Sequence, residues 1–110
     1  HMHPDSTVWD VFTPQLIRGV EERNKFHAED QEQMQARGTL TLTVEEPEVD
    51  AWADTALARY YINYSYEAPN AAQGRVRITD VFRQIDGKWL IVHHHEGTVP
   101  TGIPPITDES

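Results

Sequence analysis

Residues 75–96, with the sequence RVRITDVFRQIDGKWLIVHHHE, decide the fold of this chain. Asp86-Gly87 is a favoured two-residue hairpin loop, because both positions tolerate the positive φ that matches the twist of the flanking strands. The stretch therefore predicts two long antiparallel strands joined by a tight turn. Counting back from the turn gives the cross-strand pairs Ile85–Lys88, Gln84–Trp89, Phe82–Ile91, Asp80–His93 and Ile78–His95.

The two faces of this hairpin carry different side chains. One face is apolar near the turn and ends in an acid beside two histidines: Ile78, Phe82, Trp89 and Ile91, then Asp80, His93 and His95. The opposite face carries Val81, Leu90 and Val92, together with His94. Because both faces are partly apolar, we predict that each one is covered. A bulge before Asp80 or after Val92 would exchange the two faces, since side chains alternate along a strand.

The composition limits the function classes. A chain of 110 residues is long enough for one domain with a real core. Its net charge of −9 argues against nucleic acid and anionic membranes as partners, because both are recognised through clustered Lys and Arg. With no cysteine there is neither a disulfide nor a thiol nucleophile. No run of apolar residues approaches the length of a membrane span, and we predict a cytoplasmic protein.

The remainder of the chain alternates between short strands and one helix. Residues 20–37 have the polar composition of a surface helix, with acids in the first turn, Arg37 in the last and Gly38 as a C-terminal cap. Strands are predicted at residues 7–12, 15–18, 40–44, 49–52 and 56–66, before the hairpin. This order predicts an α+β fold with a strongly bent antiparallel sheet.

The predicted domain covers residues 7–100. Residues 1–6 are polar and are expected to be disordered, with His1 resembling a cloning remnant and Met2 the native start. Residues 101–110 form a Pro-rich C-terminal tail.

The segment TDVFRQIDGKWLIVHHHEGTVP, residues 79–100, resembles the C-terminal hairpin of SnoaL-like domains in the NTF2-like superfamily. It is also similar to the association (hub) domain of calcium/calmodulin-dependent protein kinase II. In that domain an aromatic residue, a basic pair, Asp-Gly-Lys-Trp and a Val-His-x-His ending recur. The resemblance covers roughly residues 7–100. It implies a cone of sheet and helix with a deep pocket at the open end, and dimerisation through the sheet.

Two departures from the family pattern change the expectations. The family has one or two helices before its first strand, whereas this chain begins almost at that strand. Part of the cone wall is then missing, supplied by another subunit, or cut off by a short gene start. The hub domain also places arginines where Asp80 and Glu96 stand here, so hub-type binding of anionic ligands is not expected.

The main catalytic candidates are Asp80 and His93. A carboxylate beside an imidazole orients the ring and raises its pKa, which suits general acid or base chemistry. By resemblance, SnoaL-like cyclases and related isomerases use Asp and His groups in the cone for proton abstraction next to a carbonyl. The alternative is a buried structural pair that stabilises the sheet. We predict these ligand-binding residues around the pair: His95, Tyr60, Tyr64, Phe82 and Trp89.

A metal site is the weaker interpretation of the same residues. His93, His95 and Asp80 could supply three ligands, but consecutive histidines also arise without metal, and we predict neither a metal nor a cofactor. The predicted function is binding of a small apolar molecule, with acid–base chemistry of isomerase, cyclase, dehydratase or hydrolase type left open. The alternative is a non-catalytic homodimer or higher oligomer that serves as an assembly or ligand-binding module.

Overall fold

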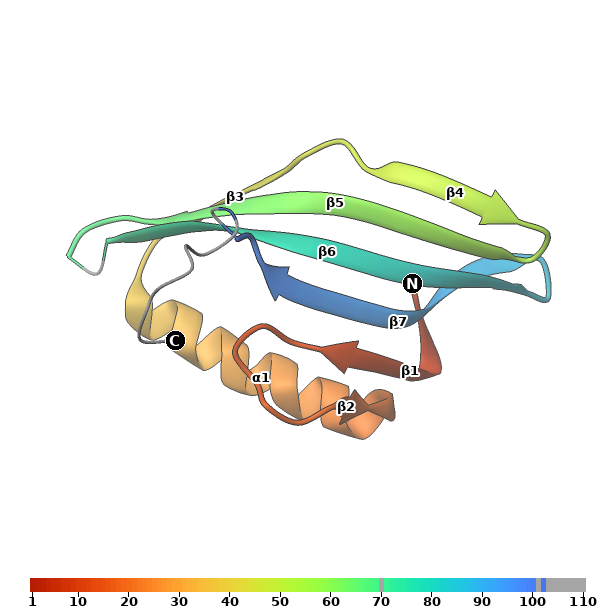
Figure 1. Ribbon diagram of the computed structural model, residues 1–110. Coiled ribbons are helices and arrows are strands. Elements are labelled where there is room, and N and C mark those ends of the chain that lie inside the picture. Colours follow the sequence, from red (N-terminus) through yellow and green to blue (C-terminus); the bar gives the residue numbers. More distant parts are fainter. Residues whose placement is uncertain (70, 101, 103–110) are drawn as a thin grey trace, which may run out of the picture.

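The computed structural model describes residues 1–69, 71–100 and 102, and these form seven strands and one helix (Figure 1). The elements in chain order are β1 (Met2–Trp9), β2 (Ile17–Arg18), α1 (Gly19–Arg37), β3 (Leu40–Val44), β4 (Glu48–Trp52), β5 (Thr55–Tyr66), β6 (Ala72–Ile85) and β7 (Lys88–Thr98). The predicted α+β class is confirmed. The predicted tail, residues 101–110, lies outside the described residues except for position 102.

The strands form one mixed sheet in the order β2-β1-β7-β6-β5-β3, and β4 also pairs with β5. The pairing of β1 with β7 is parallel, and every other pairing among the described strands is antiparallel. The three longest strands, β5, β6 and β7, lie side by side in the middle of the sheet. Figure 1 shows this sheet curving, with α1 on one side of it.

Helix α1 packs against one face of the sheet through few contacts. No residue of α1 is buried, as expected from its polar sequence. The Arg23 guanidinium donates to Ser6 Oγ at 2.6 Å, and the Arg37 guanidinium lies 5.0 Å from the centre of the Tyr66 ring. These contacts identify the helix-facing side of the sheet as the side that carries Ser6 and Tyr66.

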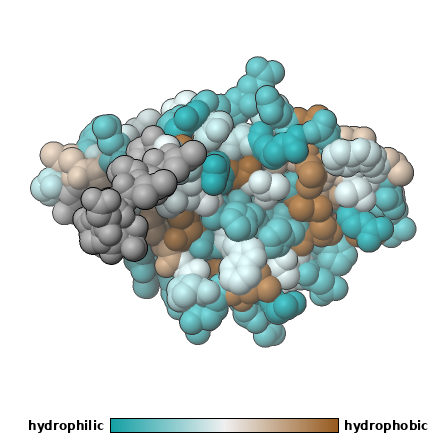
Figure 2. Space-filling model, in the orientation of Figure 1, coloured by the Kyte–Doolittle hydropathy of each residue, from teal (hydrophilic) through white to brown (hydrophobic). Residues whose placement is uncertain are grey.

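The buried core is small. Its apolar members are Val8, Ile17, Ala56, Ala58 and Ile78, and its polar members are Ser6 and Asp80. Many larger apolar side chains stay exposed instead, among them Leu42, Val44, Val49 and Trp52. The space-filling view shows apolar patches set among polar ones on one face of the molecule (Figure 2). The sequence predicted that both faces of the sheet would be covered. Within the described residues each face is covered only in part, because these apolar side chains remain exposed.

Two features of the N-terminal region differ from prediction. Strand β1 begins at Met2, so the prediction of a disordered segment at residues 1–6 is wrong. Met2 pairs with Ile91, and the Ile91 N–H donates to the His1 carbonyl at 2.9 Å. The physical reason is that β7 offers a free edge, and pairing along an edge uses backbone groups that every residue has.

The hairpin turn has the predicted geometry. Asp86 and Gly87 both have positive φ, 51° and 77°, as a type I′ turn requires. The predicted pairs next to the turn are confirmed, from Ile85 with Lys88 to Phe82 with Ile91.

We expect Gly87→Ala to lower the free energy of unfolding by about 1 kcal/mol, because an L-residue with a side chain is strained at positive φ. No heavy atom lies within 4 Å of the Cβ that alanine would add, so backbone strain is the whole cost. Urea denaturation measures the loss. The matched control is Gly87→Asn, since asparagine tolerates this conformation and should cost much less. Equal losses for the two variants would show that the turn has another conformation in solution.

Candidate functional site

A β-bulge in β7 decides which histidines lie near Asp80. Phe82 pairs with Ile91, but the next residue of β6, Val81, pairs with His93. Val92 is therefore the extra residue, and beyond it the register shifts by one. The predicted pairing of Asp80 with His93 is wrong, as is that of Ile78 with His95.

The shift exchanges the histidines between the two faces, because neighbouring residues on a strand point to opposite sides. Asp80 lies opposite His94, and Ile78 lies opposite Glu96. His93 and His95 move to the other face, opposite Val81 and Thr79.

Four side chains form a continuous hydrogen-bonded row, which we call the acid–imidazole row: Tyr60, Asp80, His94 and Glu96. The Tyr60 hydroxyl donates to Asp80 Oδ2 at 2.7 Å. Asp80 Oδ1 lies 2.5 Å from His94 Nδ1, and His94 Nε2 lies 3.0 Å from Glu96 Oε2. Asp80 is only 3% exposed, so this carboxylate has lost its water and depends on these two partners.

Neighbouring strands place the row at the middle of the sheet. Tyr60 comes from β5, Asp80 from β6, and His94 and Glu96 from β7. The pairing of Ala58 with Asp80 and of Tyr60 with Ile78 puts all four side chains on the helix-facing side. Buried Ala58 and Ile78 flank the row, so its charges lie in surroundings of low polarity.

The row continues to the end of β1. The Val11 N–H donates to Glu96 Oε1 at 3.4 Å, and the Asp10 carboxyl hydrogen-bonds to Glu96. Burial and this bond to Glu96 raise the pKa of Asp10. Burial opposes ionisation of Glu96, but the hydrogen bonds from His94 and Asp10 outweigh it and lower the pKa of Glu96. Of the two carboxyl groups, Asp10 is therefore the weaker acid and Glu96 the stronger one.

His94 carries a positive charge at neutral pH. Burial alone would lower its pKa, but the hydrogen bonds to Asp80 and Glu96 outweigh burial and raise the pKa of His94 to about 9. Burial, together with the Asp80 charge, raises the pKa of Tyr60, which stays a neutral donor. Both ring nitrogens of His94 and both oxygens of Asp80 have partners within the row, and Glu96 reaches beyond it to Val11 and Asp10.

The predicted site residues divide between the two faces of the sheet. Tyr60, Phe82 and Trp89 lie on the helix-facing side with Asp80, as does Tyr64. His93 and His95 do not. The three residues of the weaker metal interpretation cannot bind one ion together, because Asp80 lies on one face of the sheet and His93 and His95 lie on the other. In the part of the chain that the structure describes, no group of three or more metal-binding side chains occurs.

On the outer face, His93 has its own partner. Its Nδ1 lies 2.6 Å from Thr7 Oγ1 of β1. Burial, followed by the neighbouring rings of His95 and His94, lowers the pKa of His93. His93 is therefore neutral at neutral pH, in contrast to His94 next to it.

Tyr64 depends on a glycine across from it. Its ring lies over Gly74, its pairing partner on β6, and a Cβ at position 74 would be 2.5 Å from the Tyr64 oxygen. The missing side chain at Gly74 therefore leaves the space that the Tyr64 ring occupies against the sheet.

Sequence reasoning missed the roles of His94, Glu96 and Asp10. One signal was present: His94 and Glu96 are two residues apart, so on any strand they share a face. Three histidines in succession hide which of them shares a face with Asp80, because a shift of one residue leaves a histidine opposite in either case.

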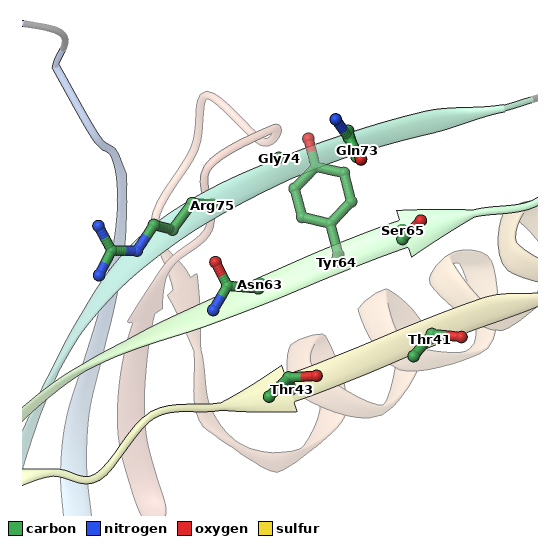
Figure 3. Close-up of a pocket in the computed structure, with 8 residues that line it drawn as sticks. All are labelled: Thr41, Thr43, Asn63, Tyr64, Ser65, Gln73, Gly74 and Arg75. Atoms are coloured by element: carbon green, nitrogen blue, oxygen red, sulfur yellow. The ribbon is translucent and has the colours of Figure 1, made fainter.

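An open groove of about 450 Å³ lies elsewhere, on the outer face of β3, β5 and β6. Figure 3 shows the polar side chains that line it, among them Thr43, Asn63, Gln73 and Arg75. Arg75 donates to both Glu45 oxygens at 3.0 Å, which neutralises its charge. The groove shares no lining residue with the acid–imidazole row, although Tyr64, a predicted ligand-binding residue, lies at its border, so this groove and the titratable groups are separate features. We take the row as the candidate site, because it holds the buried and perturbed groups.

The family model of the SnoaL-like domain matches residues 1–101. The chain belongs to the SnoaL-like domain family. No curated protein matches it. None of the helices among the described residues is long and apolar enough to cross a membrane.

Solved structures share the fold of this SnoaL-like chain at low sequence identity. An NTF2-like protein of unknown function from Pseudomonas putida KT2440 has a TM-score of 0.77 and 19% identity, over 87% of this chain and 66% of that one. A putative ketosteroid isomerase from Shewanella frigidimarina has a TM-score of 0.72 and 19% identity, over 87% and 75%. The association domain of C. elegans CaMKII has a TM-score of 0.65 and 21% identity, over 88% and 74%. The chain spans about two thirds of the length of the first of these.

Proposed function

We propose that this SnoaL-like chain binds a small, largely apolar molecule over the helix-facing side of its sheet, with the acid–imidazole row as the polar end of the site. The observation that supports this most is a buried carboxylate, Asp80, on the same face as Tyr60, Tyr64, Phe82 and Trp89. Apolar lining around a few convergent polar groups is the usual make-up of a small-molecule site.

We further propose that the Glu96–Asp10 pair performs acid–base chemistry at this site. Glu96, whose pKa is lowered, would accept a proton from carbon next to a carbonyl group, and Asp10, whose pKa is raised, is the partner that would deliver a proton to an oxygen. The His94 imidazolium holds Glu96 in place, and Asp80 with Tyr60 orients His94. The fold likeness to a putative ketosteroid isomerase and to a putative dehydratase of the NTF2-like family supports this class of reaction.

An NMR titration tests the binding proposal. With a panel of small apolar ketones and alcohols as probes, we expect amide shifts around Tyr60, His94 and Glu96. Residues of the outer groove, such as Asn63 and Gln73, should not shift. Tyr60→Phe should weaken binding several-fold, because Asp80 loses a donor.

The matched control for this titration is Tyr61→Phe. It removes a hydroxyl from the next residue, which points to the opposite face, and binding should be unchanged. Shifts confined to the groove, or equal effects of the two tyrosine variants, would contradict a site on the helix-facing side.

A second candidate function is self-assembly, as a homodimer or a higher oligomer formed through the sheet. The observation that favours it is the set of exposed apolar side chains along the β3–β4 edge, where Leu42, Val44 and Val49 are 56%, 58% and 62% exposed. Sedimentation velocity across a concentration series tests it, and a monomer at every concentration would rule it out. The cytoplasmic location stays a prediction from composition.

A further inference from the structure

Strand β3 ends the sheet with an open edge. Its inner side pairs with β5: the Glu45 N–H donates to the Tyr61 carbonyl at 2.9 Å, and the Glu67 N–H donates to the Thr39 carbonyl at 3.0 Å. In an antiparallel pair the hydrogen-bonded positions recur at every second residue. The inward positions are therefore the odd-numbered ones, and the N–H and C=O groups of Leu40, Leu42 and Val44 point outward. Within the described ranges no strand pairs with that outer side.

The β3 edge lacks the devices that usually protect an edge strand. Its sequence, LTLTV, contains no charge and no proline, and it alternates threonine with aliphatic residues that favour strands. The next edge strand, β4, differs because it carries Glu48 and Asp50. An uncharged edge with exposed Leu42 and Val44 is suited to pairing with another strand.

We propose that β3 pairs antiparallel with β3 of a second copy of this chain, about a two-fold axis at Leu42. The sequence is self-complementary in this register. Leu42 lies opposite Leu42 of the second copy, and Leu40 lies opposite its Val44. These are the residues whose backbone groups point outward, so each donates and accepts one bond across the axis. On the other face, Thr41 lies opposite Thr43 of the second copy.

Charge complementarity selects this antiparallel register. It places Glu46 of one copy opposite Gly38 of the other, beside Arg37 at the end of α1. A parallel pairing would instead bring the Glu45-Glu46 segments of the two copies together, and like charges opposite one another are unfavourable. The proposal rests on the self-assembly proposed above and adds its surface and register.

Hydrogen exchange and mixed-label NMR test the register directly. We expect the amides of Leu40, Leu42 and Val44 to exchange fast in dilute solution and to become protected as the concentration rises. Thr41 and Thr43 should be protected throughout by their bonds to β5. A sample of labelled and unlabelled chains should show an intermolecular contact between the α-hydrogens of Thr41 and Thr43, which are far apart within one strand.

Two variants separate this edge from other surfaces. Leu42→Pro removes one outward N–H and spares the bonds to β5, and Leu42→Lys places two like charges at the axis. Both should give folded monomers by sedimentation. The control is Trp52→Lys, at a position 57% exposed on the outer face of β4, which should leave the dimer intact.

A dimer that survives both Leu42 variants but is lost in Trp52→Lys would overturn the β3 edge and keep self-assembly through the outer face. A wild-type monomer at every concentration would overturn the edge and self-assembly together.

Discussion

Replacing Asp80 with alanine is expected to lower the free energy of unfolding by about 3–5 kcal/mol, the range for removing one member of a buried charged pair. The side chain is 5% exposed, and it is the partner of both the Tyr60 hydroxyl and the His94 ring. Without it, a buried imidazolium and a buried hydroxyl have no acceptor on this side. Urea denaturation at neutral pH, with circular dichroism as the probe, measures the loss.

The matched control is Asp54→Ala, which removes an aspartate from an ion pair at the surface. Asp54 accepts from Arg83 at 3.4 Å, and both side chains are more than half exposed. Exposed pairs of this kind contribute about 0–1 kcal/mol. If Asp80→Ala costs no more than Asp54→Ala, the row does not stabilise the fold in solution.

Stability is expected to fall as the pH rises from about 6.5 to about 9, because His94 loses its proton over this range. The pKa of His94 in the folded protein, about 9, lies above the ordinary value of 6.5 for a histidine in an unfolded chain. The contribution is therefore fully present below pH 6.5 and disappears as the pH passes through the folded value. A shift of this size corresponds to about 3 kcal/mol. Denaturation midpoints measured at half-unit steps between pH 6 and 9.5 test it.

The control for the pH series is a pair of histidine variants. His94→Asn should remove the slope, whereas His95→Asn, at an exposed position on the other face, should keep it. His93 and Glu96 have lowered pKa values, so their titrations act at and below pH 6.5 and do not interfere with the window. A wild-type slope in His94→Asn would show that another group carries the effect.

Local patterns were sufficient to predict most of the elements. Asp86-Gly87 predicted the hairpin, because a two-residue turn with positive φ at both positions admits few residue types. Helix α1 and strands β3 to β5 were predicted to within a residue or two at their ends. The beginning of β1 was missed, because Met2 pairs with Ile91 through backbone groups and residues 2–6 carry no alternating pattern.

The candidate site was predicted in part, and the reason lies at a single residue. Asp80, Phe82 and Trp89 share a face as predicted, since alternation near the turn and along β6 is undisturbed. Tyr60 and Tyr64 of β5 lie on the same face, which the register of β5 against β6 decides. Val92 then shifts the register, so His94 replaces His93 and Glu96 joins the row. A bulge leaves little mark on local sequence, because its position depends on what the partner strands offer.

The sequence by itself determined the turn, the strand periods, the single polar helix and the resemblance to SnoaL-like domains, because these depend on neighbouring residues along the chain. Only the tertiary structure decided which of three adjacent histidines meets Asp80. It also brought Asp10 to Glu96 from the opposite end of the chain, and this contact raises the pKa of Asp10 and lowers that of Glu96. These features depend on register across strands, where a shift of one residue moves a side chain from one face to the other.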